Sequence, residues 1–172
     1  MTVVALTGTP GTGKTTASLA MKKHGWKVLD LNRAIVSNRL YTGKDMRRKS
    51  FIADMRAVGQ FVRNKTEEGN WIIASHLSHL LSDSVINVVI VLRCQPDVLR
   101  KRLKLKKWSL AKIDENVEAE MISLISSEAR ERHKKVYDID TTKCKKTQVV
   151  VSIDKVLKGS GKRYKTAVEW LK

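Results

Sequence analysis

The chain has 172 residues, 42% of them hydrophobic, with 34 Lys and Arg against 17 Asp and Glu, a formal net charge of +17. This length suits one domain, residues 1–172, with a sizeable core, and the apolar fraction excludes wholesale disorder. The longest apolar run, residues 85–92, is too short to span a bilayer, so we expect no membrane partner. Cys94 and Cys144 form neither a metal motif nor a disulfide framework. Because no secretory signal peptide is visible, we expect the protein in the reduced cytoplasm.

The surplus of positive charge is open to two interpretations. It attracts polyanions over a long range, which fits work near nucleic acid or an assembly that contains it. The alternative is a basic surface that serves solubility alone. Aromatic residues are only 5% of the chain, so platforms for base stacking are not evident. The charge therefore indicates surroundings and not a mechanism.

Residues 8–16 read GTPGTGKTT and match the pattern G-x-x-x-x-G-K-[ST] directly after an apolar run. The glycines let successive backbone N–H groups point into one concavity sized for phosphate oxygens. Lys14 adds a positive charge for the β- and γ-phosphates, the Thr15 hydroxyl can ligate Mg²⁺, and the following helix contributes its positive end. An ordinary Gly-rich turn is the alternative. The pattern predicts that ATP is bound here, by Gly11, Gly13, Lys14, Thr15 and Thr16.

Short β-type runs alternate with helical patterns along the chain, which predicts an α/β fold with a parallel sheet. We expect about five strands with helices on both faces, the three-layer fold of P-loop NTPases. The predicted strands are residues 3–6, 27–29, 71–74, 86–92 and 136–139. The predicted helices are residues 14–24, 51–65, 96–104, 113–134 and 149–157.

Two polar segments do not fit the pattern of the core. Residues 31–49 are rich in Arg, and residues 104–112 form a short basic stretch between two predicted helices. In an enzyme of phosphoryl transfer these are the places for a flap that binds the acceptor and for a closing lid. A Gly-Ser-Gly break at residues 159–161 then precedes a basic tail, residues 159–172.

Several further motifs accompany the phosphate loop: His76 after the third strand, and residues 90–93, 102–103 and 114–120. Together they resemble the nucleoside monophosphate kinases, and more specifically the branch called adenylate kinase isoenzyme six. That branch comprises the nuclear adenylate kinase and ribosome-assembly ATPase. The resemblance covers most of the chain and weakens after about residue 157.

This resemblance implies an enzyme of broad nucleotide use that catalyses ATP + AMP = 2 ADP with Mg²⁺ and also hydrolyses ATP. It further implies a role in late maturation of the small ribosomal subunit and its rRNA. The implied partners are small-subunit ribosomal protein eleven and the pre-ribosomal particle. The basic charge agrees with that setting but does not predict it.

The resemblance also suggests roles for residues outside the phosphate loop. His76 would orient water or a phosphate, although a packing histidine is the alternative. Arg33 and Arg39 would clamp the phosphate of the acceptor, a bidentate task suited to guanidinium groups, unless they are ordinary surface residues. Lys106 would close over the donor phosphates of ATP, unless it is a solvated residue of the lid surface. It stands where the lid of the family has Arg, and lysine keeps the charge but loses the planar fork. Lys145 would approach the adenine by family analogy alone.

The chain departs from the family where an Asp-aromatic-His run normally ends the third strand, because residues 74–76 read Ala-Ser-His. That Asp helps to hold the hydration shell of magnesium. Either Ser75 replaces it through a water molecule, or the ion relies on Thr15 and phosphate oxygens. The acceptor arginine of the family aligns with Val36.

Four other polar residues receive structural interpretations. We expect Asp30 to cap the helix that follows it, and His79 either to face solvent or to pack. We assign Asn116 and Glu120 no role beyond local structure.

Three alternatives to a nucleoside monophosphate kinase remain. The first is an ATP-hydrolysing assembly switch, in which water replaces the acceptor. The second is a nucleotide-dependent module that binds rRNA or a ribosomal protein without turnover. The third is a small-metabolite kinase of the shikimate type, which shares the loop but fits the lid sequence poorly.

Overall fold

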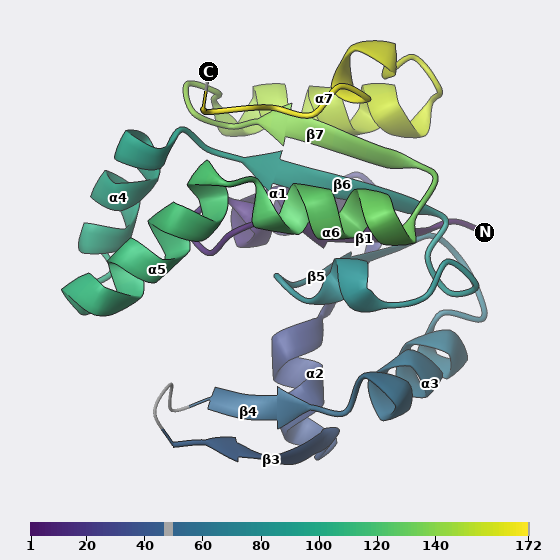
Figure 1. Cartoon of the computed structure of the whole chain (residues 1–172). Helices are drawn as coiled ribbons and strands as arrows, with labels where there is room; N and C mark the ends of the chain where they lie inside the picture. The colour runs from purple at the N-terminus through teal and green to yellow at the C-terminus, as the bar shows by residue number, and fades with distance from the viewer. Residues whose placement is uncertain (47–49, 172) are drawn as a thin grey trace.

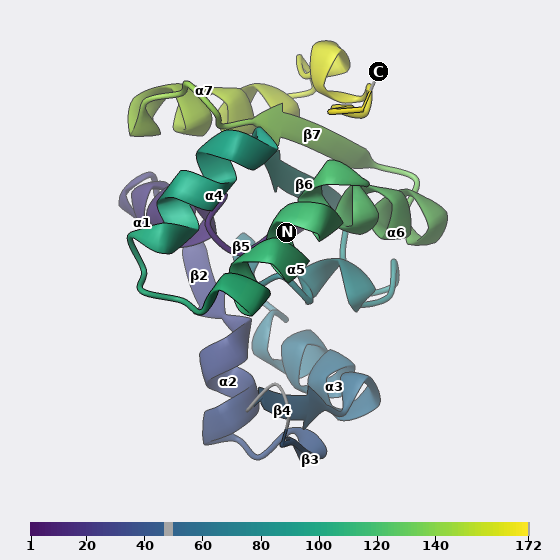
Figure 2. The same ribbon diagram turned by 60° about the vertical axis from the view of Figure 1, so that its left-hand side comes forward.

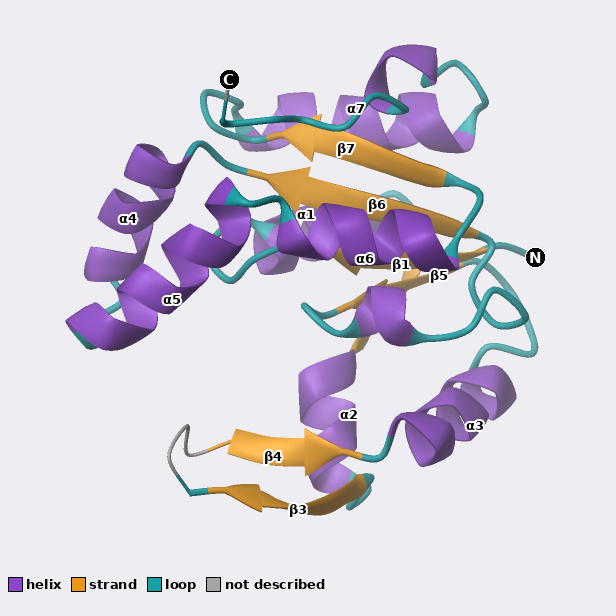
Figure 3. Ribbon diagram, viewed as in Figure 1, coloured by secondary structure: helices purple, strands orange, loops and turns teal. Residues whose placement is uncertain are grey.

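The structure is a computed structural model that describes residues 1–46 and 50–171. Its centre is a five-stranded sheet in the order β2-β5-β1-β6-β7, in which every pairing is parallel (Figures 1 and 3). The strands agree with the five predicted runs, and their bounds are β1 Val3–Thr7, β2 Lys27–Asp30, β5 Trp71–Ala74, β6 Val88–Arg93 and β7 Val136–Asp140.

Helices cover both faces of this sheet. One face packs against α1 and α7, and the other packs against α2, α3 and α6. The helix bounds are α1 Lys14–Lys23, α2 Leu31–Ser37, α3 Met55–Lys65, α4 Pro96–Lys104, α5 Leu110–Met121, α6 Leu124–Arg132 and α7 Lys146–Leu157, with short helical turns η1 Ser78–Leu80 and η2 Lys162–Tyr164.

The side chains of β1 alternate between the two faces. Val4 and Leu6 pack with α1 and α7, whereas Val3 and Ala5 pack with the helices of the opposite face. All four are at most 1% exposed, because a parallel strand that is covered on both sides is apolar throughout. The arrangement is the predicted three-layer fold of P-loop NTPases.

The phosphate loop leaves the central strand of the sheet. β1 lies between β5 and β6. Beyond β5 the sheet ends with β2, and beyond β6 it ends with β7. The crevice at the carboxyl ends of such strands is where open α/β sheets bind ligands. The motif found in the sequence is therefore at the position that the topology favours for binding.

The segment 31–49 differs from its prediction. It contains α2 and the strand β3, Tyr41–Asp45, which pairs antiparallel with β4, Ser50–Ala53. Leu31 and Ile35 are buried in the core, so the expectation that this segment stays outside the core is wrong for its first part. Residues 47–49 of the predicted flap lie outside the described residues.

The helix predicted at residues 51–65 begins later than expected. Its first residue is Met55, and the Asp54 side chain caps it by accepting from the backbone N–H groups of Arg56 and Ala57. Ile52 belongs to β4 and is exposed. The range predicted as one helix thus contains a strand and a helix, since a capping aspartate separates them.

The long helix predicted at residues 113–134 is two helices, α5 and α6. Ser123 between them has a left-handed φ of 58°. The guanidinium of Arg93 donates to the Ser123 hydroxyl at 2.9 Å and to the Glu120 carbonyl at 3.1 Å. A buried arginine from β6 therefore holds the break, which the local helical periodicity could not indicate.

The helices α4 and α5 project beyond the carboxyl end of the sheet, and the β3–β4 hairpin lies below the edge that β2 forms (Figures 1 and 2). We call α4, α5 and the connecting residues 105–109 the lid. Its helices pack around a small core of their own, formed by Cys94, Leu99, Leu103, Ile113 and Val117. The predicted lid, residues 104–112, is the turn of this unit and the start of α5.

The chain turns after α7 and returns over the sheet. α7 ends at Leu157 as predicted, and Gly159 has a φ of 78°. The C-terminal segment then runs back along β7 toward the start of α4 (Figure 3). Val168 N donates to Asp138 Oδ2 of β7 at 3.0 Å, so the predicted basic tail is docked on the fold.

In residues 1–46 and 50–171, no helix is long and apolar enough to cross a membrane.

Candidate nucleotide-binding site

The phosphate loop, residues 8–13, joins β1 to α1. Gly11 and Gly13 have φ angles of 95° and 104°, in the left-handed region that glycine adopts without strain. A Cβ atom at Gly11 would also lie 2.9 Å from side-chain atoms of both Leu99 and Leu103. Glycine at this position therefore lets α4 pack directly on the loop, and Gly13 serves as the N-cap of α1.

Lys14 places its ammonium group across the loop. Its Nζ donates to the carbonyl oxygens of Gly8 at 2.5 Å and Thr9 at 3.0 Å. The pKa of Lys14 is lowered from 10.5 to about 7, mainly by burial and in part by the charge of Lys106, while the charge of Glu120 opposes the shift. The positive charge of Lys14 is therefore held at a cost, which an anionic ligand would remove.

His76 lies just beyond β5, within electrostatic range of the same ammonium group. Burial lowers the pKa of His76 to about 4, and the charges of Lys14, His79 and Lys112 act in the same direction. The imidazole is neutral at pH 7 as a result. A neutral ring can accept a hydrogen bond from one partner and donate one to another.

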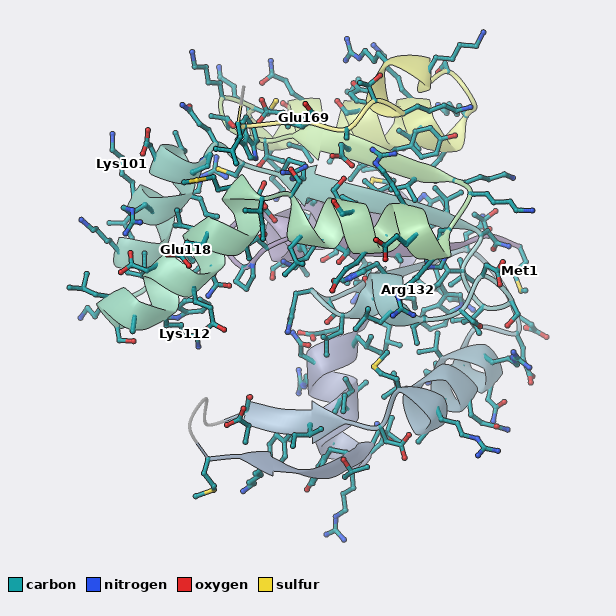
Figure 4. All side chains as sticks on the ribbon, in the orientation of Figure 1. Met1, Lys101, Lys112, Glu118, Arg132 and Glu169 are labelled. Atoms are coloured by element: carbon teal, nitrogen blue, oxygen red, sulfur yellow. The ribbon has the colours of Figure 1, made fainter. Side chains whose placement is uncertain are left out.

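The lid contributes two lysines around Trp108. The Nζ atoms of Lys106 and Lys112 lie 5.8 Å and 4.0 Å from the centre of the indole ring. Lys112 lies on the side of α5 that faces the hairpin, whereas Lys101 lies on the outer side of α4 (Figure 4). Lys106 acts on Lys14 and Lys112 acts on His76. The structure thus brings Lys14, His76 and Lys106 together, with Lys112 as a member that the sequence analysis did not single out.

Glu120 is the second residue that the sequence analysis missed. It is 2% exposed, and its Oε2 accepts a hydrogen bond of 2.6 Å from the Thr9 hydroxyl in the phosphate loop. The expectation of a merely local role is wrong, because the two residues are 111 positions apart. One signal was present: Glu120 follows Ile113 and Val117 on the buried stripe of α5.

Ser75, at the missing acidic position, is already engaged. Its hydroxyl donates to Asn32 Oδ1 at 2.9 Å and accepts from the backbone N–H of Leu77 at 3.0 Å. The side chain links the segment after β5 to α2, and the residue is 1% exposed.

His79 is buried and not solvent-facing, so of the two expectations packing is the correct one. Its Nδ1 lies 3.0 Å from the Thr7 hydroxyl, and its Nε2 lies 3.0 Å from the Glu128 carboxylate. Burial lowers the pKa of His79, while the hydrogen bond to the Glu128 carboxylate opposes that effect. This chain of contacts ties the segment that carries His76 to the end of β1 and to α6.

Comparisons with known proteins agree with this geometry. A family model described as an AAA domain matches residues 4–123. Three archaeal proteins share the name "Putative adenylate kinase". The protein of Methanosarcina mazei is 40% identical, covering 90% of this chain and 86% of its own. Those of Archaeoglobus fulgidus and Methanocaldococcus jannaschii are each 36% identical, covering 98% and 97% of this chain and 92% of their own. The chain belongs to the family of these putative adenylate kinases.

Solved structures show the same fold at low sequence identity. A shikimate kinase of Bacteroides thetaiotaomicron has a TM-score of 0.64 and 18% identity, covering 91% of this chain and 98% of its own. A deoxyadenosine kinase of M. mycoides has a TM-score of 0.57 and 13% identity, covering 91% and 99%. At these identities the likeness shows a shared fold and does not indicate the substrate of this chain.

The two predicted acceptor arginines are at opposite ends of α2. Arg33 is in its first turn, next to the carboxyl end of β2, where the Asp30 side chain caps the helix as predicted by accepting from Arg33 N at 3.1 Å. Arg39 follows the other end, beside the hairpin, with a left-handed φ of 55°. At a rise of ~1.5 Å per residue, a helix of this length separates them by roughly 10 Å. The two side chains therefore leave the chain from different ends of α2.

Three other predicted residues lie at the starts of α1 and α7. Thr15 and Thr16 are exposed in the first turn of α1. Lys145 begins α7, where its backbone N–H donates to Gln148 Oε1 at 2.7 Å. The segment before Lys145 is tied to the lid, because Arg102 donates to the Thr141 carbonyl at 2.8 Å.

The donor groups fit Mg²⁺ that arrives with a nucleotide. In the part of the chain that the structure describes, no group of three His, Cys, Asp or Glu residues could hold a metal ion. Mg²⁺ is commonly bound through few protein oxygens, with waters and substrate phosphates as the other ligands. The exposed hydroxyl of Thr15 beside the phosphate loop is such an oxygen.

Proposed function

We propose that this protein is a nucleoside monophosphate kinase that transfers the γ-phosphoryl group of ATP to AMP. The observation that carries the proposal is the convergence of Lys14, Lys106 and His76 on one phosphate loop. Phosphoryl transfer needs positioning and neutralisation of charge more than covalent chemistry. A buried ammonium with its pKa lowered to about 7 and lysines on a separate lid meet that need.

Each group has a defined task in this proposal. The loop N–H groups and Lys14 bind the donor phosphates, and Lys106 and Lys112 bring further positive charge when the lid covers them. The neutral imidazole of His76 orients the attacking oxygen by accepting its hydrogen bond. The Thr15 hydroxyl would hold Mg²⁺, which would supply positive charge to the phosphates of the nucleotide.

The engagement of Ser75 supports one of the two expectations for the metal. Its hydroxyl proton is already donated to Asn32, and it already accepts from Leu77. We therefore infer that the ion relies on Thr15 and phosphate oxygens, without Ser75.

For the acceptor we favour Arg33 over Arg39. Arg33 follows β2 at the carboxyl edge of the sheet, where the phosphate loop also lies. Lys145 and Thr16 complete the proposed ATP site, on the rim next to the lid.

The experiment is to incubate the protein with ATP and Mg²⁺, with and without AMP, and to measure ADP and free phosphate. The kinase predicts ADP that depends on AMP and appears without phosphate. ADP with stoichiometric phosphate, unchanged by AMP, contradicts it. Lys14→Ala should abolish turnover. Lys101→Ala is the matched control, because this exposed lysine lies on the outer side of α4 (Figure 4).

ATP hydrolysis is the second candidate function. A neutral His76 beside Lys14 can orient a water molecule as well as an acceptor oxygen. This would accord with the isoenzyme six branch, a cytoplasmic role in maturation of the small ribosomal subunit, and ribosomal protein eleven or rRNA as partners. The net charge of +17 supports an anionic partner, and salt-dependent RNA binding would test it.

A further inference from the structure

The buried carboxylate of Glu120 connects three distant parts of the chain. It projects from the end of α5 and is 2% exposed. A buried carboxylate destabilises a protein unless its oxygens accept several hydrogen bonds or face a cation. The carboxylate of Glu120 meets this condition, and its two oxygens have different partners.

One oxygen contacts the phosphate loop, and the other contacts the end of β6 and the C-terminal segment. Oε2 accepts from the Thr9 hydroxyl at 2.6 Å. Oε1 accepts from Arg93 Nε at 2.8 Å, from Cys94 N at 3.0 Å and from the indole Nε1 of Trp170 at 3.1 Å. A carboxylate is rigid, so the donors on Oε1 fix the direction in which Oε2 points.

Thr9 is central to the phosphate loop. Its carbonyl oxygen accepts from Lys14 Nζ at 3.0 Å and from the Thr12 hydroxyl at 2.8 Å. A shift of Thr9 would move the oxygen that positions the ammonium group of Lys14. The Glu120–Thr9 hydrogen bond therefore acts on the loop geometry that binds phosphate.

The C-terminal segment meets the same carboxylate. The Trp170 ring lies 5.7 Å from the Arg93 guanidinium, and Arg93 also donates to the Val168 carbonyl at 2.7 Å. Figure 1 shows this segment passing over β7 to the end of the sheet where the lid begins. Docking of Trp170 thus supplies one of the three donors to Glu120 Oε1.

We propose that Glu120 is a positioning residue for the phosphate loop, and that docking of the C-terminal segment through Trp170 strengthens ATP binding by holding Glu120 against Thr9. This inference rests on the proposed function only in requiring that the loop binds ATP. It assigns a role in nucleotide binding to a segment at the opposite end of the sequence.

The direct variant, Glu120→Gln, removes counter-charge from buried Arg93 and would mix folding with binding effects. The test is therefore a double-mutant cycle of Thr9→Val and Trp170→Phe, with the Kd for ATP measured by calorimetry. Thr9→Val should weaken binding about tenfold, because a hydrogen bond to a charged group is lost. Trp170→Phe should weaken it about fivefold, a typical size for coupling between sites.

The two substitutions should not add. Without the Thr9 hydroxyl, Trp170→Phe should leave the Kd unchanged within about twofold, since both act through one carboxylate. Thr9→Ser keeps the hydroxyl and should restore the sensitivity to Trp170→Phe. Trp71→Phe is the matched control, because the Trp71 indole donates to the Glu68 carbonyl at 2.9 Å in another part of the fold. It should lower the free energy of unfolding without changing the Kd.

Two results would overturn the inference. In one, Trp170→Phe leaves the Kd for ATP of the otherwise unmodified protein unchanged. In the other, its effect is equal with and without the Thr9 hydroxyl. Either result leaves the proposed function intact, whereas an unmodified, folded protein that binds no ATP overturns both.

Discussion

Lys106 of the lid lies where its charge lowers the pKa of Lys14 in the phosphate loop, in addition to the larger effect of burial. The two residues are far apart in the sequence, and the fold brings like charges together. Such an arrangement is unfavourable by itself and becomes favourable when phosphate oxygens lie between the ammonium groups. This relationship gives the site a pH dependence that can be measured.

The first prediction concerns proton uptake. The pKa of Lys14 is about 7 in the free protein, and bound phosphate raises it by favouring the charged form. Above pH 7 each ATP that binds should therefore take up part of a proton, and affinity should fall as pH rises. Calorimetry at pH 8 in two buffers of different ionisation enthalpy measures this uptake. Lys106→Ala should reduce it, because the pKa of Lys14 then rises; equal heats in both buffers would contradict the prediction.

The second prediction concerns His76. Its pKa of about 4 means that the ring stays neutral as pH falls from 8 to 5.5. NMR should show no titration of the His76 ring in that interval, with the signal assigned by comparison with His76→Gln. The substitution should lower kcat by about a hundredfold if the ring orients the reacting oxygen. A His76 ring that titrates between pH 6 and 7, or an unchanged kcat, would argue against this role.

The third prediction separates the two arginines of α2. Arg33→Ala should raise the KM for AMP by roughly tenfold or more, because a charge-assisted contact with phosphate is lost. Arg39→Ala should change it less than about threefold, as expected for a surface residue. Initial rates with AMP varied at saturating ATP provide the measurement. The reverse order would place the acceptor beside the hairpin and not at the sheet edge.

The fourth prediction concerns the buried arginine of β6. Arg93 pairs with Glu120 at 2.8 Å and with Asp138 at 2.9 Å, and it is 1% exposed. Arg93→Met leaves the buried carboxylate of Glu120 without a cation and that of Asp138 with Arg130 alone. It should lower the free energy of unfolding by about 3–5 kcal/mol. Urea denaturation measures the loss. Arg100→Met, which breaks the exposed ion pair with Asp114, is the control and should cost less than about 1 kcal/mol. Equal losses would show that burial of the Arg93 pairs is unimportant.

Periodicity and backbone chemistry made much of the fold predictable. Short apolar runs predicted the five strands, and the spacing of neighbouring glycines predicted the phosphate loop. The errors occur where local periodicity continues across a boundary. The helix predicted at residues 51–65 runs across the cap at Asp54. The helix predicted at residues 113–134 runs across the turn at Ser123, which Arg93 holds from a strand.

The candidate site was likewise predicted only where it depends on local sequence. Lys14 and its glycines were found from spacing alone, because a phosphate-binding loop is a local conformation. Lys112 was not singled out, and Glu120 was given only a local role. The expected task of Arg33 and Arg39, which lie at opposite ends of α2, stays a prediction. Charge and residue type do not indicate which side of a helix faces a ligand.

The phosphate loop, the parallel sheet that presents it and the resemblance to nucleoside monophosphate kinases could all be predicted from the order of the residues. These features depend on conformations of neighbouring residues and on apolar periodicity, which are local properties of a sequence. The burial of Lys14 near Lys106, the neutral state of His76 and the carboxylate shared by Thr9 and Trp170 became visible in the folded chain alone. Those properties arise from desolvation and from contacts between residues that are far apart in the sequence, which no local pattern encodes.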